Sequence, residues 1–584
     1  METASCSKTN TETDPSITNE QLYTEHRGLR IPVSRAISRA TPSIKPKAIN
    51  KWLASLPLAH DVQSAIALTT FIEETNRINY PLAARFKALE TLQTTVQSIL
   101  SKFRKNSQST QWPPSERNLK QYSINLALLN AVSTGYQICV VDLLEQTGNP
   151  SRRSLATCLQ RALQALGQAL MSSYTKYTSA PDKLWYNLHQ LYLIARSFNC
   201  KDRMVKNIAD LSPAQSSVAF EYKKQFLIQI AGPMRLLNSQ IIELETLAEG
   251  WAHDLEIDVL SENDKAGGIF IVDPLHDGPP VRISQAKKLE LDPLYSINLD
   301  PINERLLKIL EAGKKGEPLP QIAGVTPSGT LVKLLLSDWL RSDKRIFKRS
   351  LKSGTLQAAL GLTNSFNFID HTNGNTAAQS PEANSPLALS ELEGGQSSSF
   401  NKKSFDGNIS DYATKAKQTN ATSITLHSEK IHLHHCKIVN VSANGYCLQR
   451  QGSSPAKVQI GDVVALHEQD NAHALNSSVG VVRWLHFDSG NGLSFGIQVL
   501  SPIAQPLRTS FNNNGRKTYL PGLGLPEMPA LQQSASILTS THRYKSGDHI
   551  QINKAQQRIN IQLGQRLERH QGYDRFKYKI CVKK

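Results

Sequence analysis

Apolar residues recur at steps of three and four along residues 48–255, and this spacing predicts helices. One such stripe consists of Leu155, Leu159, Leu163, Leu166, Leu170 and Tyr174. Residues with this period lie on one face of a helix, so each helix must bury its stripe against a neighbour. Breaks rich in Pro, Gly and Ser divide the region into about six to eight helices. We therefore expect a helical domain, as a bundle or short array, over residues 48–255.

The pattern changes after residue 255. Residues 256–340 combine Gly- and Pro-rich segments with short strand-like pieces and further helical stretches, which predicts a mixed α/β connecting region. From residue 341 to 505, short segments such as "GDVVALHE", "SVGVVRWLHF" and "LSFGIQVLSP" follow one another closely. Strands at this spacing are typical of a small antiparallel barrel. Residues 506–584 continue in the same style and predict a further small, basic β unit that extends the chain.

Two parts of the chain lack either period. Residues 1–47 are rich in Ser, Thr and Pro, and residues 370–424 are dominated by Ser, Asn, Ala, Thr and Gly. Such compositions bury too little apolar surface to offset chain entropy. We expect a disordered tail over 1–47 and a disordered insertion over 370–424, which the barrel tolerates because loop-closure entropy grows slowly with length. The predicted fold class is multidomain α + β, with an N-terminal α-helical bundle or array followed by an antiparallel barrel.

The charge of the chain points to an anionic partner. Its 66 Lys and Arg residues exceed its 49 Asp and Glu residues by 17. Residues 505–584 hold 14 basic and 4 acidic residues, a net charge of +10. Nucleic acid, a nucleotide or a membrane surface would each suit such a field. No apolar run approaches the roughly 20 residues of a membrane helix. The seven scattered cysteines form no Cys-x-x-Cys pair, so we expect a protein of the reducing cytoplasm.

An arginine motif stands immediately before the first barrel strand. The segment "RSDKRIFKRS" contains Arg341-x-x-x-Arg345 and, overlapping it, Arg345-x-x-x-Arg349. The second pair leads directly into the strand and is therefore preferred, with Arg341 as the alternative first arginine. A guanidinium group can pair bidentately with a phosphate, or with guanine O6 and N7, and can stack on a purine face. The segment is thus suited to close on an anionic nucleotide from one side.

A second motif, "NVSANG", follows the predicted insertion. Asn440 and Ser442 point the same way because strand side chains alternate with period two, so both can hydrogen-bond to a base edge or ribose. Gly445 allows the backbone to turn without a Cβ, and we expect it at positive φ. With the insertion removed, this strand lies beside the strand after Arg349. The two motifs then form two halves of one site.

An Arg-x-x-x-Arg segment followed by Asp/Asn-x-Ser-x-x-Gly resembles the PilZ family of bacterial receptors for cyclic di-GMP. "IGDVVAL", "GVVRW" and "GLSFGIQVL" resemble the remaining strands of that family. The resemblance covers residues 341–369 and 425–505. It implies a six-stranded barrel with the arginine segment at its mouth, packed over the ligand. Asn440 stands where the family more often has Asp, and the insertion lengthens the gap between the motifs.

Other candidate residues favour structural roles. The histidines and cysteine of "HLHHC" have metal-ligand chemistry, but no second ligand pair follows at zinc spacing, so we expect no metal site. Trp484, beside Arg483, could stack on a base, although a tryptophan in a barrel strand more often lies in the core. No phosphate loop, dinucleotide-binding glycine motif or nucleophile elbow is present, so we expect no catalytic residues and no enzyme.

The sequence therefore predicts a bacterial, cytoplasmic cyclic di-GMP effector without a cofactor. We expect the ligand to order the arginine segment and so to redirect the helical domain, which would act on a downstream protein. One alternative is a basic nucleic-acid-binding or ribosome-associated protein that uses the +10 C-terminal region. Another is a barrel that has lost its ligand and serves as a protein-docking module.

Overall fold

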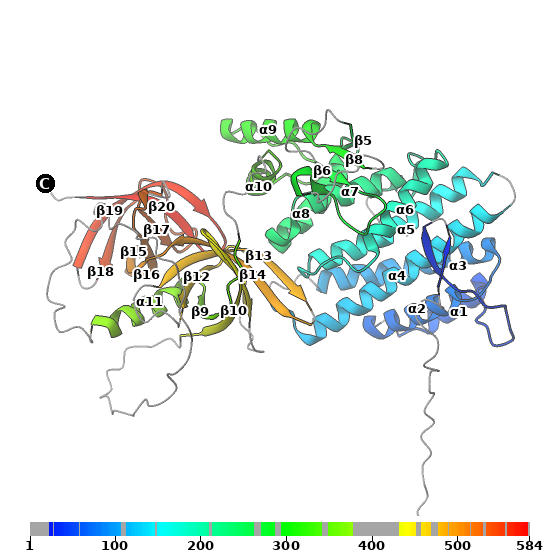
Figure 1. Ribbon diagram of the computed structural model, residues 1–584, viewed down its shortest axis with the longest axis horizontal. Coiled ribbons are helices and arrows are strands. Elements are labelled where there is room, and N and C mark those ends of the chain that lie inside the picture. The colour runs from blue at the N-terminus through cyan, green and yellow to red at the C-terminus, as the bar shows by residue number, and fades with distance from the viewer. Residues whose placement is uncertain are drawn as a thin grey trace, which may run out of the picture. The chain divides into compact units, whose positions relative to one another are not determined.

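The structure, a computed structural model, describes most of the chain between residues 23 and 581 (Figure 1). Outside the described residues lie 1–22, 27, 58, 107–111, 147–148, 209–212, 262–269, 286–293, 341–348, 378–430, 451–456, 469–476, 489, 514–515, 530–532, 555–556 and 582–584. Contacts divide the chain into two compact units. The first comprises Met1–Thr110 with Pro114–Arg345, and the second comprises Gln111–Pro113 with Ile346–Lys584.

The first unit is predominantly helical, as the apolar periodicity predicts. Its helices are α1 (Pro46–Ser55), α2 (Asp61–Asn76), α3 (Leu82–Asn106), α4 (Glu116–Glu145), α5 (Arg152–Tyr174), α6 (Leu184–Ser197), α7 (Val218–Ile230), α8 (Asn238–Trp251), α9 (Asp300–Lys315) and α10 (Gly329–Trp339). Serine side chains cap several of them; Ser115, for example, accepts the Asn118 N–H at the start of α4. The Leu155 to Tyr174 stripe of α5 is buried throughout, which confirms the helical domain.

Helix α4 lies in the core of this unit, against α2, α3 and α5 (Figure 1). Its length and composition would suit a membrane span, with a mean hydropathy of 1.4 over 18 residues. However, 72% of that window is buried inside the unit, as in the core helix of a globular domain. The packing of α4 therefore accounts for its apolar sequence.

Short strands complete the first unit. They are β1 (Tyr23–His26), β2 (Leu29–Pro32), β3 (Val205–Lys206), β4 (Gln215–Ser216), β5 (Glu256–Val259), β6 (Phe270–Val272), β7 (Val281–Arg282) and β8 (Tyr295–Asn298). The last four form one sheet in the order β5-β8-β6-β7, so this part of the first unit mixes α and β. The expectation of a disordered tail up to residue 47 is wrong for β1 and β2, because buried Leu29 and Ile31 hold this hairpin against α4 and α6.

The second unit contains two closed antiparallel barrels of six strands each. The first has the order β10-β11-β14-β13-β12-β9 and the second β15-β16-β17-β20-β19-β18. Their strands are β9 (Thr355–Leu360), β10 (Leu433–Ser442), β11 (Gly445–Arg450), β12 (Val463–Glu468), β13 (Ser478–Asp488), β14 (Gly492–Ser501), β15 (Gln505–Asn513), β16 (Arg516–Leu525), β17 (Ser536–Thr539), β18 (His549–Lys554), β19 (Gln557–Arg569) and β20 (Asp574–Ile580). The small β unit predicted after residue 505 is thus a complete barrel.

One helix and one apolar core connect the two barrels. Helix α11 (Leu362–Ala377) packs on β9 and β12 of the first barrel and on β15 and β16 of the second. Its Phe366 and Ile369 share a buried cluster with Leu523 and Leu538. This helix was not predicted, and its end falls in the predicted insertion, although Leu362, Phe366 and Ile369 have helical spacing. The rest of the predicted insertion, residues 378–424, lies outside the described residues.

Candidate functional site

The "NVSANG" segment forms the hairpin between β10 and β11. Ser442 is opposite Gly445 in the register, with Ala443 and Asn444 in the turn. The Ser442 hydroxyl donates to the Gly445 carbonyl at 3.4 Å. Asn440 and Ser442 lie two positions apart at the end of β10, and both line the same cleft in the barrel wall. Their common direction is the one that strand periodicity predicts.

Gly445 is required for a different reason from the expected one. It is not among the described glycines with positive φ, so the expectation of a left-handed backbone is wrong. Instead, β11 passes very close to β14. A Cβ at Gly445 would lie 2.1 Å from the backbone oxygen of Ile497, closer than any real Cβ approaches such an atom. The glycine therefore allows the close approach of two strands under the cleft.

Backbone pairing brings the end of the arginine motif to this hairpin. Ser350 N donates to Val441 O at 2.9 Å, and Val441 N donates to Ser350 O at 3.0 Å. Val441 lies between Asn440 and Ser442, so Arg349, next to Ser350, is placed at the same cleft. Arg341 and Arg345 lie outside the described residues. Of the predicted site residues, Arg349, Asn440, Ser442 and Gly445 line this one cleft.

A side-chain network also ties this segment to the barrel. Lys352 Nζ and Glu468 Oε2 lie 2.8 Å apart, and the Tyr446 hydroxyl donates to Glu468 Oε1 at 2.9 Å. Burial, together with the negative charge of Glu468, raises the pKa of Tyr446, so its hydroxyl stays protonated and remains a donor. The residues just after Arg349 are therefore attached through both backbone and side chains.

The cleft has a volume of about 130 Å³ and a positive lining. It is lined by Arg349, Asn440, Ser442, Asn444, Gly445, Tyr446, Cys447, Arg483, Trp484, Gly496, Ile497 and Gln498. Arg349 and Arg483 are the charged members of this set, and none of the described lining residues is acidic. Burial raises the pKa of the Cys447 thiol, and the positive charge of Arg349 acts to lower it. Two guanidinium groups thus offer donors for an anion at the cleft.

Sequence reasoning wrongly assigned Trp484 to the barrel core. Its side chain is half-buried and lines the cleft, with the indole lying over Gly496. A Cβ at Gly496 would lie 1.8 Å from Trp484 Nε1. A register shift between Val482 and Trp484 on β13 alters the alternation there. Sequence periodicity does not reveal such a bulge, and the adjacent Arg483 was considered only together with Trp484.

Arg483 connects the cleft to the second barrel. Its Nε donates to Gln498 Oε1 at 2.8 Å, and its Nη2 donates to Glu568 Oε2 at 3.1 Å. Glu568 also accepts from the Tyr573 hydroxyl at 2.7 Å and from Arg575 Nη1 at 3.2 Å. Burial alone would raise the pKa of Glu568. Hydrogen bonds from His570, Tyr573 and Arg483, with the charge of Arg483, outweigh burial and lower that pKa, so Glu568 is ionised.

The histidines of "HLHHC" are arranged as strand residues. His434 is half-buried, His432 and His435 are exposed, and Cys436 is buried. Burial raises the pKa of the Cys436 thiol to about 12, which keeps it protonated. Among the residues that the structure describes, no three His, Cys, Asp or Glu side chains form a group that could hold a metal ion.

Comparisons with known proteins cover nearly the whole chain. Three family models match in succession: "Cyclic-di-GMP receptor FimW, N-terminal domain" over residues 47–263, "Cyclic-di-GMP receptor FimW, middle PilZ domain" over 269–506, and "FimW C-terminal beta-barrel domain" over 505–581. The chain is 26% identical over 580 residues to the cyclic-di-GMP receptor FimW of Pseudomonas aeruginosa, covering 95% of this chain and 93% of that protein. No solved structure gives a significant match.

Proposed function

We propose that this chain, which belongs to the PilZ-domain family, is a receptor that binds cyclic di-GMP at the cleft of its first barrel. The relative named as a cyclic-di-GMP receptor aligns with 95% of this chain. The observation that carries the proposal is the convergence of Arg349 with Asn440, Ser442 and Gly445 around one positively charged cleft. These residues come from two motifs that are far apart in the sequence.

The chemistry of the cleft suits this dinucleotide. Cyclic di-GMP carries two phosphodiesters and two guanines. Arg349 and Arg483 can pair with the phosphates or the guanine acceptors, and charge-assisted hydrogen bonds of this kind contribute about 1.5–3 kcal/mol each. Asn440 and Ser442 offer an amide and a hydroxyl on one face, and Trp484 offers a ring on which a purine can stack. All these interactions serve binding, and we assign no catalytic step to the site.

We further propose that Arg345, with Arg341 as the alternative, closes on the ligand from the segment before Arg349. The division between the two compact units falls between Arg345 and Ile346, inside this segment. A ligand that holds the segment against the barrel would therefore change how the helical unit is oriented, and that unit would act on a downstream protein. Small-angle scattering with and without saturating ligand should differ; identical curves would contradict the coupling while leaving the binding proposal intact.

Calorimetric titration of the full chain with cyclic di-GMP tests the binding proposal directly. We expect saturable binding in buffer of physiological salt, and no comparable binding of GMP, which lacks the second phosphate and base. Arg349→Ala should weaken binding, whereas Arg558→Ala should not. Arg558 is an exposed arginine of β19 outside the cleft, so it controls for loss of one positive charge. Absence of wild-type binding would refute the proposal.

Salt dependence separates the proposal from the nucleic-acid alternative. A polyanion that neutralises many basic residues is displaced steeply by salt. A dinucleotide with two phosphates held in a cleft should lose much less affinity between 50 and roughly 200 mM salt. Binding of single-stranded RNA by the +10 C-terminal region, without cyclic di-GMP binding, would favour the alternative. A ligand-free docking module would bind neither molecule.

A further inference from the structure

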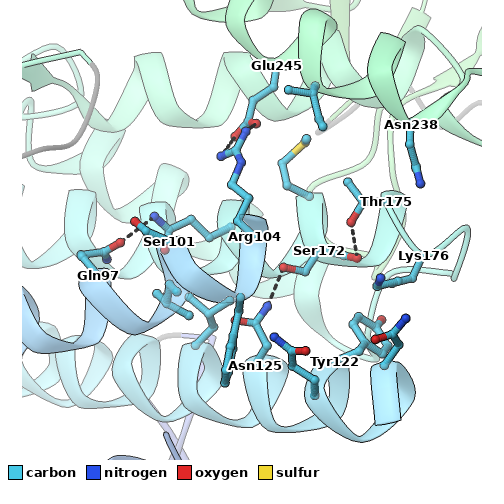
Figure 2. Close-up of a pocket in the computed structure, with 18 residues that line it drawn as sticks. Gln97, Ser101, Arg104, Tyr122, Asn125, Ser172, Thr175, Lys176, Asn238 and Glu245 are labelled. Carbon is cyan, nitrogen blue, oxygen red and sulfur yellow. Dashed lines mark hydrogen bonds and ion pairs between the residues drawn. The ribbon is translucent and has the colours of Figure 1, made fainter. Parts of the chain in front are cut away.

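The helical unit contains a second cavity, separate from the barrel cleft. It has a volume of about 140 Å³ and opens among α3, α4, α5 and α8 (Figure 2). A cavity of roughly 150 Å³ is known to accept a benzene-sized molecule. Because this cavity is also open to solvent, a larger ligand could bind there with one end exposed. Neither sequence motif contributes to it.

One wall of the cavity is apolar. Leu100 and Phe103 of α3, Leu129 of α4, Met171 of α5 and Ile242 of α8 form this wall. The first four are at most 9% exposed, so their positions are fixed by packing. Apolar surface left facing a cavity favours a ligand with a ring or chain, because burial of such surface contributes roughly 25 cal/mol per Å².

Most polar groups that line the cavity already have partners. The Tyr122 hydroxyl bonds with Ser173 and Thr178, and Asn125 Nδ2 donates to Ser172 Oγ at 2.7 Å. Arg104 and Glu245 form an ion pair that bridges α3 and α8. Figure 2 shows this pair on the side of the cavity away from Lys176 and Asn238. These groups define the walls and leave few atoms to recognise a ligand.

Two amide oxygens are exceptions. Gln168 Nε2 donates to Gln97 Oε1 at 3.2 Å, and Gln97 Nε2 donates to Gln93 Oε1 at 3.3 Å. This directional chain leaves Gln168 Oε1 buried without a hydrogen-bond partner among the described residues. Asn238 Oδ1, at the start of α8, is likewise buried without a hydrogen-bond partner among the described residues. A buried acceptor without a donor is unfavourable, and a ligand with an N–H or O–H group would supply the missing hydrogen bond.

The charges of the lining favour an anionic end on that ligand. The charged lining residues are Arg104, Lys176 and Glu245, so the lining has a net charge of +1. Lys176, immediately after α5, is 5% exposed. Burial lowers the pKa of its ammonium group to about 8, so it still carries most of its charge at neutral pH. An acidic group beside Lys176 would stabilise that charge.

We propose that this cavity is a second small-molecule site, for an amphipathic ligand with an apolar ring system, a hydrogen-bond donor and one acidic group. The apolar part lies against Met171 and its neighbours, and the acidic group faces Lys176. The donor reaches Gln168 or Asn238. The helical unit would thus bind a small-molecule ligand of its own, independently of the nucleotide cleft in the barrel.

Two fluorescent probes test the proposal on the full chain. Anilinonaphthalene sulfonate and N-phenylnaphthylamine share one ring system and one N–H donor and differ in the sulfonate. We expect each to bind at one site, the sulfonate about tenfold more tightly, in line with one charge-assisted interaction. Lys176→Met should reduce the affinity for the sulfonate to that of the neutral probe and leave the neutral probe unchanged. Lys120→Met, at an exposed lysine of α4 outside the cavity, is the matched control.

Cavity-filling variants locate the probes. Ile242→Trp, at a half-buried wall position, should abolish binding of both, and Leu129→Phe provides a second filler if the first lowers the melting temperature. Saturating cyclic di-GMP should not displace either probe. The proposal is refuted if both probes bind equally well, if the two lysine variants act alike, or if folded filler variants still bind. Displacement by cyclic di-GMP would also refute it.

Discussion

Ser350 and Val441 exchange both of their backbone hydrogen bonds, at 2.9 and 3.0 Å, although 91 residues separate them (441 − 350 = 91). This bridge places Arg349 next to the strand that carries Asn440 and Ser442. Side chains near the cleft can be substituted without removing these hydrogen bonds, because the four atoms that form them belong to the main chain. Substitutions at Arg349 should therefore report on ligand binding rather than on folding.

Arg349→Ala should weaken cyclic di-GMP binding by roughly 10- to 100-fold, the equivalent of one charged hydrogen bond of about 1.5–3 kcal/mol. Arg349→Lys should fall between wild type and the alanine variant, because lysine keeps the charge but not the planar fork of donors. Calorimetry measures both affinities. Equal affinities for the lysine and wild-type proteins would show that Arg349 acts only as a point charge.

Trp484 should report ligand binding by fluorescence. Of the chain's six tryptophans, it is the one that lines the cleft, and its ring lies over Gly496. A guanine that approaches this ring should change its emission. We expect a saturable change on titration with cyclic di-GMP that is lost in Trp484→Phe and retained in Trp52→Phe, whose half-buried ring belongs to α1. An unchanged signal in Trp484→Phe would place the ligand away from this ring.

Glu568→Gln should tighten cyclic di-GMP binding a few-fold. Glu568, in the second barrel, forms an ion pair with Arg483. Without the negative charge of Glu568, the Arg483 guanidinium should attract a phosphate more strongly. A partly exposed ion pair contributes up to about 1 kcal/mol, which sets the size of the effect. Glutamine keeps the size and an acceptor oxygen. Glu527→Gln, at an exposed position of the same barrel, controls for net charge. Weaker binding in Glu568→Gln would mean that Glu568 instead holds Arg483 in its binding position.

Gly445→Ala should destabilise the first barrel by several kcal/mol or displace β14, because its methyl group would meet the Ile497 carbonyl at 2.1 Å. Thermal unfolding of the full chain measures the loss. Gly329→Ala is the control, since a Cβ there has nothing within 4 Å and alanine favours the first turn of α10. Normal stability with lost ligand binding would show that Gly445 acts on the ligand rather than on strand spacing.

Asp462 should make stability depend on pH. Burial raises the pKa of Asp462 to about 6. The backbone N–H of Gln459 donates to Asp462 Oδ2 at 2.8 Å and acts in the opposite direction, but burial is the larger effect. Between the usual aspartate pKa of about 4 and this value, the folded state binds more protons than the unfolded state, so stability falls as pH rises. Asp462→Asn should therefore stabilise the protein by about 3 kcal/mol at pH 7.5 and hardly at pH 4.

Asp488 provides the opposite case for that measurement. It accepts the backbone N–H groups of Gly490 and Asn491, each at 2.8 Å, and these bonds lower its pKa. Its contribution is present above the ordinary aspartate pKa and disappears as pH falls below it. Asp488→Asn should hence lower the melting temperature at neutral pH. A stability difference for Asp462→Asn that is the same at both pH values would contradict the burial argument.

Local patterns predicted the elements well, and the site residues less completely. The stripe ending at Tyr174 is a buried helix, and the period of two correctly orients Asn440 and Ser442. Trp484 was wrongly expected in the core, and a β-bulge that the sequence does not reveal shifts the register beside it and Arg483. Glu568 could not be connected to the cleft from the sequence, because its position depends on how a second barrel packs against the first.

The role of Gly445 illustrates the same limit. A glycine at the end of a turn motif suggests backbone freedom, and only the neighbouring strand reveals the steric requirement. Helix α11 was missed for a related reason. Its sequence is rich in Asn and Thr, and its four large apolar residues, Leu362, Phe366, Phe368 and Ile369, are buried in the core that the two barrels share.

That shared core also has a consequence for truncation. Leu500 of the first barrel, Phe366 of α11, and Leu523 and Tyr573 of the second barrel belong to one buried cluster. A truncation near residue 505 would remove the second barrel's part of this cluster and expose the remainder to water, and such a fragment should aggregate. The two barrels should therefore be expressed and purified as a single piece.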